Sequence, residues 1–165
     1  MILETRYFGE LEVDESGIIY FNSGLPGFDE VRRFVMIENE DKASPFKWLQ
    51  GVDEPKPAFV IVDPFAIKRD YEINIDDETL NELGIASPDT VAVYSIVVVP
   101  EDITKMTMNL QAPLIINTEN RKGKQLILDT ERYGVRHYIL DELQGREEAE
   151  NARADKEEGS VHCYK

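Results

Sequence analysis

Apolar and polar residues alternate along much of the chain, a period of two that is typical of β-strands with one buried face. Between Leu3 and Val13 every charged residue falls on the same parity, which predicts one solvated face and one packed face. The turn-forming segment Asp14–Gly17 then leads into Ile18–Phe21, where the sheet pattern resumes. This arrangement predicts a strand meander at the start of the chain.

Two longer apolar segments in the second half predict strands with different surroundings. Val91–Val99 is apolar at both parities, so we expect a central strand covered on both faces. Met106–Asn117 alternates, but Pro113 interrupts it and predicts an edge, a bend or a bulge, since proline cannot donate to a ladder. Residues 118–123 predict a hairpin loop, with Gln125–Leu128 as the returning strand. Further strands are expected at Phe34–Glu38, Phe46–Gly51, Ala58–Val62 and Tyr71–Ile75.

Only one interior segment has the features of a helix. Asp76 and the two acids after it supply an N-cap and a negative first turn, Leu80 and Leu83 are three residues apart, and Gly84 provides a stop. Many short strands with one short helix predict a mainly β fold. We expect a small antiparallel β-barrel that is closed or nearly closed.

The composition changes near residue 141. Residues 141–165 contain eight acids and four Lys or Arg, a net charge of −4, and between Asp141 and Gly159 the only larger apolar residue is Leu143. Such a segment buries too little surface to fold alone. We therefore expect a β-barrel domain over residues 1–140 and an acidic C-terminal extension over 141–165 that is helical or disordered.

The acidic charge limits the function classes. The 165 residues include 33 acids against 18 Lys plus Arg, a formal net charge of −15. Such a surface repels nucleic-acid phosphates and anionic membranes, and it favours a basic protein or peptide as partner. The first residues do not resemble a signal peptide, and the apolar stretch Ile96–Val99 is far shorter than the about 20 residues of a membrane span. We expect a cytoplasmic protein that binds neither membrane nor nucleic acid directly.

Side chains suited to catalysis are few, and no phosphate-binding, dinucleotide-binding, nucleophile-elbow or EF-hand motif is present. A structural role is favoured for His137, while His162 beside the single cysteine, Cys163, supplies only half of a metal site. Asp76–Glu78 fits a helix cap better than a metal or acid–base cluster, and Arg121–Lys124 fits a solubilising hairpin tip. We expect a protein that has no enzymatic activity and binds neither a metal ion nor a cofactor. The alternative is a small-molecule-binding or hydrolytic β-barrel that uses His137.

Large apolar side chains interleave with acids directly after Pro64, and this segment is the main candidate for partner binding. Phe65 and Tyr71 would anchor a partner while Asp70 and Glu72 steer its basic side chains. The competing interpretation places both rings in the core and leaves the acids as a solvated face.

A second pair of candidate contacts lies on the strand predicted at Met106–Asn117. Asn109 and Gln111 occupy its polar parity, where their side-chain amides can hydrogen-bond a partner. Cross-strand hydrogen bonding within the sheet is the alternative.

Several short segments of the chain occur in an order and at a spacing that resemble those of one protein family. They are Ser23–Phe28, Val62–Phe65, Asp70–Tyr71, Asn109–Asn117, Gly123–Gln125 and Arg136–His137. Physically, Gly24, Pro26 and Gly27 can hold a sharp loop whose Phe28 turns back into the core. Together the segments resemble the flagellar assembly factor FliW family over about residues 1–140.

The resemblance implies a small β-barrel-like protein without enzymatic activity. Members of the family bind cytoplasmic flagellin, through its C-terminal region, and also bind the RNA-binding translational repressor CsrA. The two partners compete for one pool of factor, so that export of flagellin frees factor to antagonise CsrA. Antagonism by mimicry of RNA and antagonism from a separate allosteric surface both stay open, as does which surface meets which partner. We expect a monomer when no partner is bound.

Overall fold

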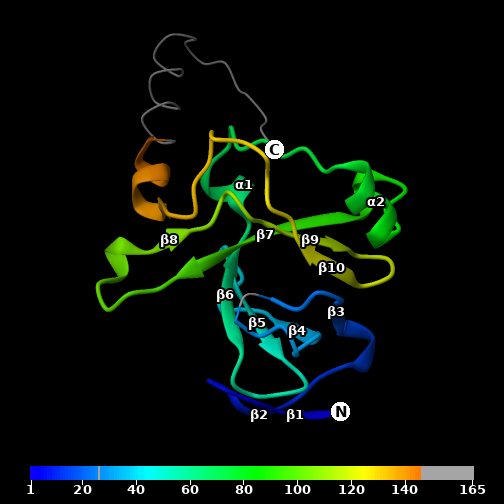
Figure 1. Cartoon of the computed structure of the whole chain (residues 1–165). Helices are drawn as coiled ribbons and strands as arrows, with labels where there is room; N and C mark the ends of the chain where they lie inside the picture. Colours follow the sequence, from blue (N-terminus) through cyan, green and yellow to red (C-terminus); the bar gives the residue numbers. More distant parts are fainter. Residues whose placement is uncertain (26, 146–165) are drawn as a thin grey trace.

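The short alternating segments form the strands of a β-barrel (Figure 1). The computed structural model describes residues 1–25 and 27–145. Pro26, which belongs to the predicted sharp loop, and residues 146–165, which include His162 and Cys163, lie outside the described residues. Within the described ranges, no helix combines the length and the apolar character that crossing a bilayer requires.

Seven strands close the barrel. The strands from the barrel and its sheet extension are β3 (Ile19–Phe21), β4 (Arg33–Ile37), β5 (Phe46–Gly51), β6 (Ala58–Val62), β7 (Val91–Val98), β8 (Thr107–Met108), β9 (Leu114–Asn117), β10 (Lys122–Gln125) and β11 (His137–Tyr138). The ring runs from β3 through β4, β5, β6, β7, β9 and β10 back to β3, and β8 and β11 extend the sheet from β7. The predicted mainly β barrel is confirmed, and β7 is central in its pairing, with β6, β8 and β9 as neighbours. The expected cover on both faces fails at its C-terminal end, where Val98 is 61% exposed.

One pairing in the ring departs from the predicted antiparallel arrangement. β10 and β3 are parallel, with Lys122 opposite Tyr20, whereas every other neighbouring pair in the ring is antiparallel. A closed ring with an odd number of strands cannot alternate direction at every step. One parallel pair is therefore a geometric requirement of seven-stranded closure.

The barrel interior is packed with aromatic and aliphatic side chains. Phe21 and Phe34 are fully buried and meet edge to face, with ring centroids 5.6 Å apart. Gly123 of β10 lies directly against Phe21, and a Cβ at this position would stand 2.7 Å from a ring carbon. The ring therefore fits only because residue 123 has no side chain.

The predicted sharp loop at Ser23–Phe28 is present in its described residues. Gly24 has a φ of +67°, and a Cβ there would lie 2.7 Å from the Cα of Asp29. The loop returns Phe28 to the interior, where its ring packs against Phe59 at 5.9 Å between centroids.

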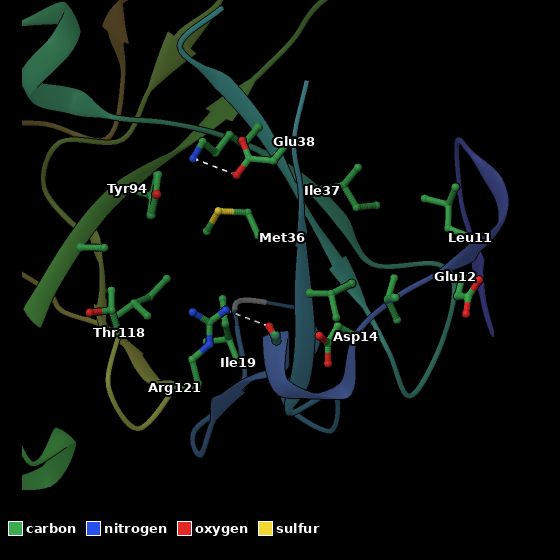
Figure 2. Close-up of a pocket in the computed structure, with 16 residues that line it drawn as sticks. Leu11, Glu12, Asp14, Ile19, Met36, Ile37, Glu38, Tyr94, Thr118 and Arg121 are labelled. Atoms are coloured by element: carbon green, nitrogen blue, oxygen red, sulfur yellow. Dashed lines mark hydrogen bonds and ion pairs between the residues drawn. The ribbon is translucent and has the colours of Figure 1, made fainter. Parts of the chain in front are cut away.

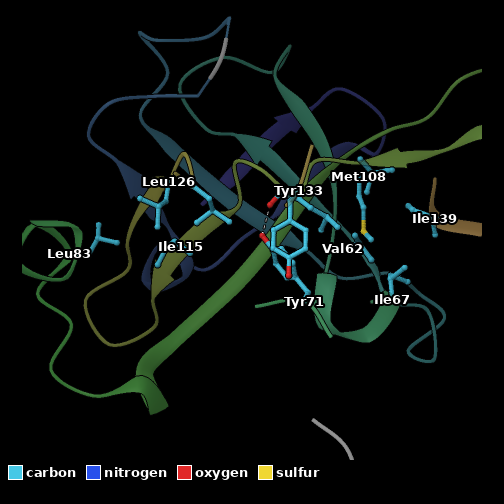
Figure 3. Close-up of a cluster of buried hydrophobic side chains, with 12 residues drawn as sticks. Val62, Ile67, Tyr71, Leu83, Met108, Ile115, Leu126, Tyr133 and Ile139 are labelled. Carbon is cyan, nitrogen blue, oxygen red and sulfur yellow. Dashed lines mark hydrogen bonds between the residues drawn. The ribbon is translucent and has the colours of Figure 1, made fainter. Parts of the chain in front are cut away.

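A second hydrophobic core covers the outer face of the barrel (Figure 3). It forms where the excursion between β6 and β7 and the segment after β10 fold over β7 and β9. Tyr71 and Tyr133 meet at its centre, with ring centroids 4.7 Å apart. Leu83 of the excursion and Leu126 of the later segment are buried in the same cluster. This core fixes the residues of the main candidate surface.

The excursion contains the predicted helix and a second one. In α2 (Asp77–Leu83) the Asp76 carboxylate accepts from the Thr79 N–H at 2.9 Å, and Gly84 ends the helix with a φ of 66°. The one-turn helix α1 (Pro64–Ile67) was not predicted, although Asp63 as N-cap before proline is a start signal. Single turns of 3₁₀-helix occur at η1 (Glu15–Gly17), η2 (Pro88–Thr90) and η3 (Ile103–Lys105).

The strand predicted at Tyr71–Ile75 is wrong. Burial does alternate there, with residues 71, 73 and 75 turned inward, but no strand within residues 1–25 and 27–145 pairs with the segment. Instead Glu72 donates its N–H to the Tyr133 hydroxyl at 3.0 Å. The alternation reflects a segment that covers the outer core rather than one that joins the sheet.

The alternating segment Leu3–Val13 forms a hairpin of two short strands instead of one continuous strand. β1 (Ile2–Thr5) and β2 (Gly9–Glu12) pair with each other and form a separate two-stranded sheet at the end of the molecule opposite α1 (Figure 1). Residues 6–8 turn the chain, and Gly9 has a φ of 65°. Charge parity continued across the turn, so the alternation alone gave no sign of the break.

The predicted strand Met106–Asn117 is also divided, with β8 before a turn and β9 after it. The bend at Pro113 is confirmed, whereas the return strand begins at Lys122, earlier than predicted. At the C-terminal side, residues 139–145 are helical, so helix begins two residues before the expected boundary at 141. The division into a domain and an extension stays a prediction, because most of the extension lies outside the described residues.

Candidate partner-binding surface

The structure brings the predicted patch residues together around α1. Phe65 lies in α1, and Asp70, Tyr71 and Glu72 follow it in the same excursion from the barrel. The rings of Phe65 and Tyr71 are 5.4 Å apart. The segment that contains Tyr133 packs beside them, so two distant parts of the chain form this face.

Tyr71 belongs to the core and does not offer its ring to a partner. Its side chain is 3% exposed, and its hydroxyl donates to the Leu110 carbonyl at 2.7 Å. Burial raises the pKa of the Tyr71 phenol, because the charged form would be poorly solvated. The predicted role of Tyr71 as an anchor is therefore corrected: the residue holds the surface from beneath, while Phe65 is half-buried at its edge.

The two predicted acids are exposed and lie next to bases. Asp70 pairs with Lys68 at 3.2 Å, and Glu72 pairs with Arg132 at 3.3 Å. Partial burial disfavours the Lys68 ammonium, but Asp70 and Glu142 outweigh this effect and raise the pKa of Lys68. The two segments that form the face, 63–72 and 129–142, together contain seven acids against four Lys or Arg. The face is acidic even with its ion pairs formed.

Asn109 and Gln111 shape a turn instead of sharing the polar face of a strand. The side-chain oxygen of Asn109 accepts from the N–H groups of Gln111 and Ala112 at 3.1 and 3.0 Å. The N–H groups of Leu110 and Gln111 donate to the Gly134 carbonyl, which ties this turn to the same surface. Asn109 thus does its hydrogen bonding within the chain, and contact of either residue with a partner stays a prediction.

His137 is engaged at both ring nitrogens. Its Nε2 accepts from the Gly134 N–H at 2.9 Å, and its Nδ1 lies 3.0 Å from a carboxylate oxygen of Glu142. Because Nε2 accepts a hydrogen bond, the ring proton lies on Nδ1, and the Nδ1–H group donates a hydrogen bond to the Glu142 carboxylate. This arrangement links β11 to the helical residues 139–145 and favours the structural interpretation of His137 over a catalytic one.

No cluster suited to a metal ion was found among the described residues, in which at least three His, Cys, Asp or Glu side chains would converge. The predicted cap at Asp76–Glu78 is confirmed in place of an acid–base cluster. The pair His162 and Cys163 falls outside the part of the chain that the structure describes.

The basic segment Arg121–Lys124 lies at the β9–β10 hairpin, as predicted, but two of its bases are engaged within the fold. Arg121 donates to the Gly17 carbonyl at 2.9 Å, and its backbone φ is 63°. Lys124 pairs with Glu82 of α2 at 2.7 Å, and this hydrogen bond raises the pKa of Lys124. Both bases hold neighbouring elements against the barrel, so they do not form a basic patch for nucleic acid.

One end of the barrel is hollow (Figure 2). The cavity has a volume of about 520 Å³, and its lining includes Ile19, Met36, Tyr94, Lys47 and Arg121. Lys47 pairs with Glu38 at 3.2 Å. The lining mixes both charges.

Exposed aromatic residues at the tip of the first hairpin were missed by sequence reasoning. Tyr7 and Phe8 are 54% and 41% exposed, and each ring lies 5.3 Å from the ring of Trp48. Two adjacent aromatic residues before a glycine were a signal of such a tip, but the strand pattern concealed the turn.

Comparison with known proteins identifies the family. The family model described as FliW protein matches residues 2–139. A flagellar assembly factor FliW from Ruminiclostridium cellulolyticum is 50% identical over 147 residues, which cover 89% of this chain and 99% of that protein. The same factor from Alkaliphilus metalliredigens is 48% identical over 159 residues, 96% of this chain and 98% of that protein.

The fold agrees with the sequence comparison. A crystal structure of the flagellar assembly factor FliW is 40% identical and matches with a TM-score of 0.79, covering 84% of this chain and 96% of the other. The ordered motifs, the near-complete coverage of the relatives and the shared barrel lead to one conclusion. The chain belongs to the FliW family of flagellar assembly factors.

Proposed function

We propose that this protein binds flagellin in the cytoplasm, through the C-terminal region of flagellin, and in its free form binds and antagonises the translational repressor CsrA. The observation that carries the proposal is membership of the FliW family across residues 2–139. Its role is then regulatory. Flagellin that awaits export binds the protein and keeps it from CsrA. Once flagellin is exported, the free protein binds CsrA and relieves repression of flagellin translation. The linkage is between two binding equilibria that share one component.

The charge of the protein supports this choice of partner. A net charge of −15 favours association with a basic protein, and an RNA-binding repressor presents a basic surface. The acidic face around α1 is our candidate for that contact. There Asp70 and Glu72 are exposed, and Phe65 offers a partly open ring beside them.

Isothermal titration of the full-length protein with purified flagellin and with CsrA tests the proposal. We expect binding of each at micromolar or tighter affinity. Absence of binding to both would contradict the function.

A charge-reversal pair tests the assigned face. We expect the double variant Asp70→Lys, Glu72→Lys to weaken CsrA binding by about tenfold or more, because charges at an interface act over several ångströms. The matched control is Glu4→Lys, Glu10→Lys on the β1–β2 hairpin, which changes the net charge equally at the opposite end of the molecule (Figure 1). Equal losses in both double variants would show that only net charge matters and would remove the assignment to this face.

A further inference from the structure

The central strand β7 is longer than its partner on one side. β6 pairs with it only from Val97 to Ser95, where Val62 is the last residue of β6. On the opposite side, β9 pairs with Val91–Tyr94. Among the residues that the structure describes, no strand pairs with the β6-side edge of Val91–Tyr94.

The register shows which peptide groups face this open edge. The Thr118 N–H donates to the Thr90 carbonyl at 2.8 Å, which makes this a hydrogen-bonded pair of the β7–β9 ladder. Because such pairs alternate, Ala92 and Tyr94 bond to β9, and the C=O group of Val91 and both the N–H and C=O groups of Val93 point the other way. They point to the side that β6 has left. The N–H of Val91 donates to the Pro88 carbonyl, where η2 ends.

The chain itself is prevented from completing the ladder. Extended by the same register, β6 would place Pro64 opposite Val93, and proline has no N–H to donate. The chain instead turns at Asp63, whose carboxylate accepts from the Phe65 N–H at 2.9 Å and caps α1. The wall of the barrel is therefore interrupted at a defined position.

A hollow runs along this interruption. A cavity of about 400 Å³ lies between Val91–Tyr94 on one side and the segments 44–47 and 63–66 on the other. An apolar groove of about 440 Å³, floored by Val91 and Val93, adjoins it toward α2. Side chains of an added strand would thus find an apolar surface on the outer face of β7.

We propose that Val91–Tyr94 is a docking edge for an extended, basic segment of a protein partner, which pairs with β7 as an additional strand. Main-chain hydrogen bonds to Val91 and Val93 would hold the segment, and its apolar side chains would enter the groove. Charge complementarity sets its basic character: Asp63 is an exposed acid in the lining of the hollow, Lys47 in the same lining is neutralised by Glu38, and the protein as a whole has a net charge of −15. The inference rests on the proposed function in taking the occupant to be a protein.

Amide hydrogen exchange measured by NMR on the full-length protein tests the docking edge. The probes are flagellin, CsrA and the synthetic peptide acetyl-Lys-Val-Thr-Val-Thr-Val-Lys-amide. A partner on this edge should slow exchange at Val93 by about tenfold or more, since its N–H group acquires an acceptor, whereas the N–H of Val91 already donates to Pro88. Ala92 and Tyr94, already bonded to β9, should change little. The matched control is the same peptide N-methylated at alternate residues, which cannot complete the ladder and should give no protection.

The outcomes separate this inference from the proposed function. Protection of Val93 without protection of Ala92 and Tyr94, by at least one of the three probes, supports the docking edge. Binding of flagellin or CsrA, when none of the three probes protects Val93 more than Ala92 and Tyr94, keeps the proposed function and overturns the edge. Protection by the peptide when neither protein binds supports the edge and contradicts the proposed function, whereas no binding by any probe contradicts both.

Discussion

At the scale of single residues, the contacts that hold this fold depend on side chains that a one-dimensional pattern does not distinguish. Gly123 is one of ten glycines in the chain, and among the glycines that the structure describes it alone lies against the buried Phe21 ring. Tyr71 has the same aromatic character as the exposed Tyr7, but it is buried and bonded to a backbone carbonyl. Such differences arise from tertiary contacts.

Replacement of Gly123 by alanine should destabilise the protein. The new Cβ would stand 2.7 Å from a ring carbon of the fully buried Phe21. Overpacking of this kind typically lowers the free energy of unfolding by about 1–3 kcal/mol, because side chains and backbone must shift to make room. Urea unfolding measures the change. Gly17→Ala is the matched control, because a Cβ there meets nothing within 4 Å. Equal stability of the two variants would contradict the close contact.

Tyr71→Phe should lower the free energy of unfolding by about 1–2 kcal/mol, because it leaves the Leu110 carbonyl without its buried donor. Partner affinity measured on the folded variant should stay near that of the unchanged protein. Tyr20→Phe, at a side chain that is 44% exposed, is the control for the loss of a hydroxyl. A large loss of affinity in Tyr71→Phe without a loss of stability would restore Tyr71 as a partner contact.

At the scale of elements, prediction succeeds where local chemistry decides and fails where distant packing decides. α2 could be predicted because its cap, first turn and terminal glycine all lie within nine residues. The segment Tyr71–Ile75 has a strand pattern but pairs with none of the strands in the described part of the chain, and the barrel is already closed beneath it. Asn109 was placed on a strand because nothing local shows that β8 ends at Met108.

The cap of α2 should make stability depend on pH in the acid range. Hydrogen bonds from Thr79 lower the pKa of Asp76, so the ionised carboxylate favours the folded state. This contribution is complete above the ordinary pKa of an aspartate and is lost as the pH falls through the lowered value.

We therefore expect Asp76→Ala to be less stable than the unchanged protein at pH 7 and the difference to shrink toward pH 3, measured by thermal unfolding across pH. Asp77→Ala removes an acid of the same turn without the cap and is the control. A difference independent of pH would show that the carboxylate charge has no part in the cap.

At the scale of the whole molecule, charge and closure were predictable for different reasons. The charge is a sum over residues and needs no structure, whereas barrel closure follows from the number of short strands. The parallel pair β3–β10 and the open edge of β7 could not be predicted, because both depend on which strands become neighbours. The candidate surface was found in outline, since Phe65, Asp70 and Glu72 gather around α1, but its supporting residue Tyr133 comes from far along the chain.

The net charge of −15 should appear in association kinetics. We expect the association rate with CsrA to fall by about tenfold or more between 50 and 500 mM salt, because screening shortens the range of electrostatic steering. The dissociation rate, which reflects short-range contacts, should change less and serves as the internal control in stopped-flow measurements. An association rate that is constant across this range would remove steering from the account.

Competition between the two proposed partners tests the central claim most directly. Fluorescently labelled CsrA is bound to the full-length protein, and unlabelled flagellin is titrated in while anisotropy is followed. The account predicts that flagellin releases labelled CsrA completely, at concentrations that rise in proportion to the CsrA present. Retention of CsrA in a complex that also contains flagellin, or failure of saturating flagellin to release it, would contradict partner switching.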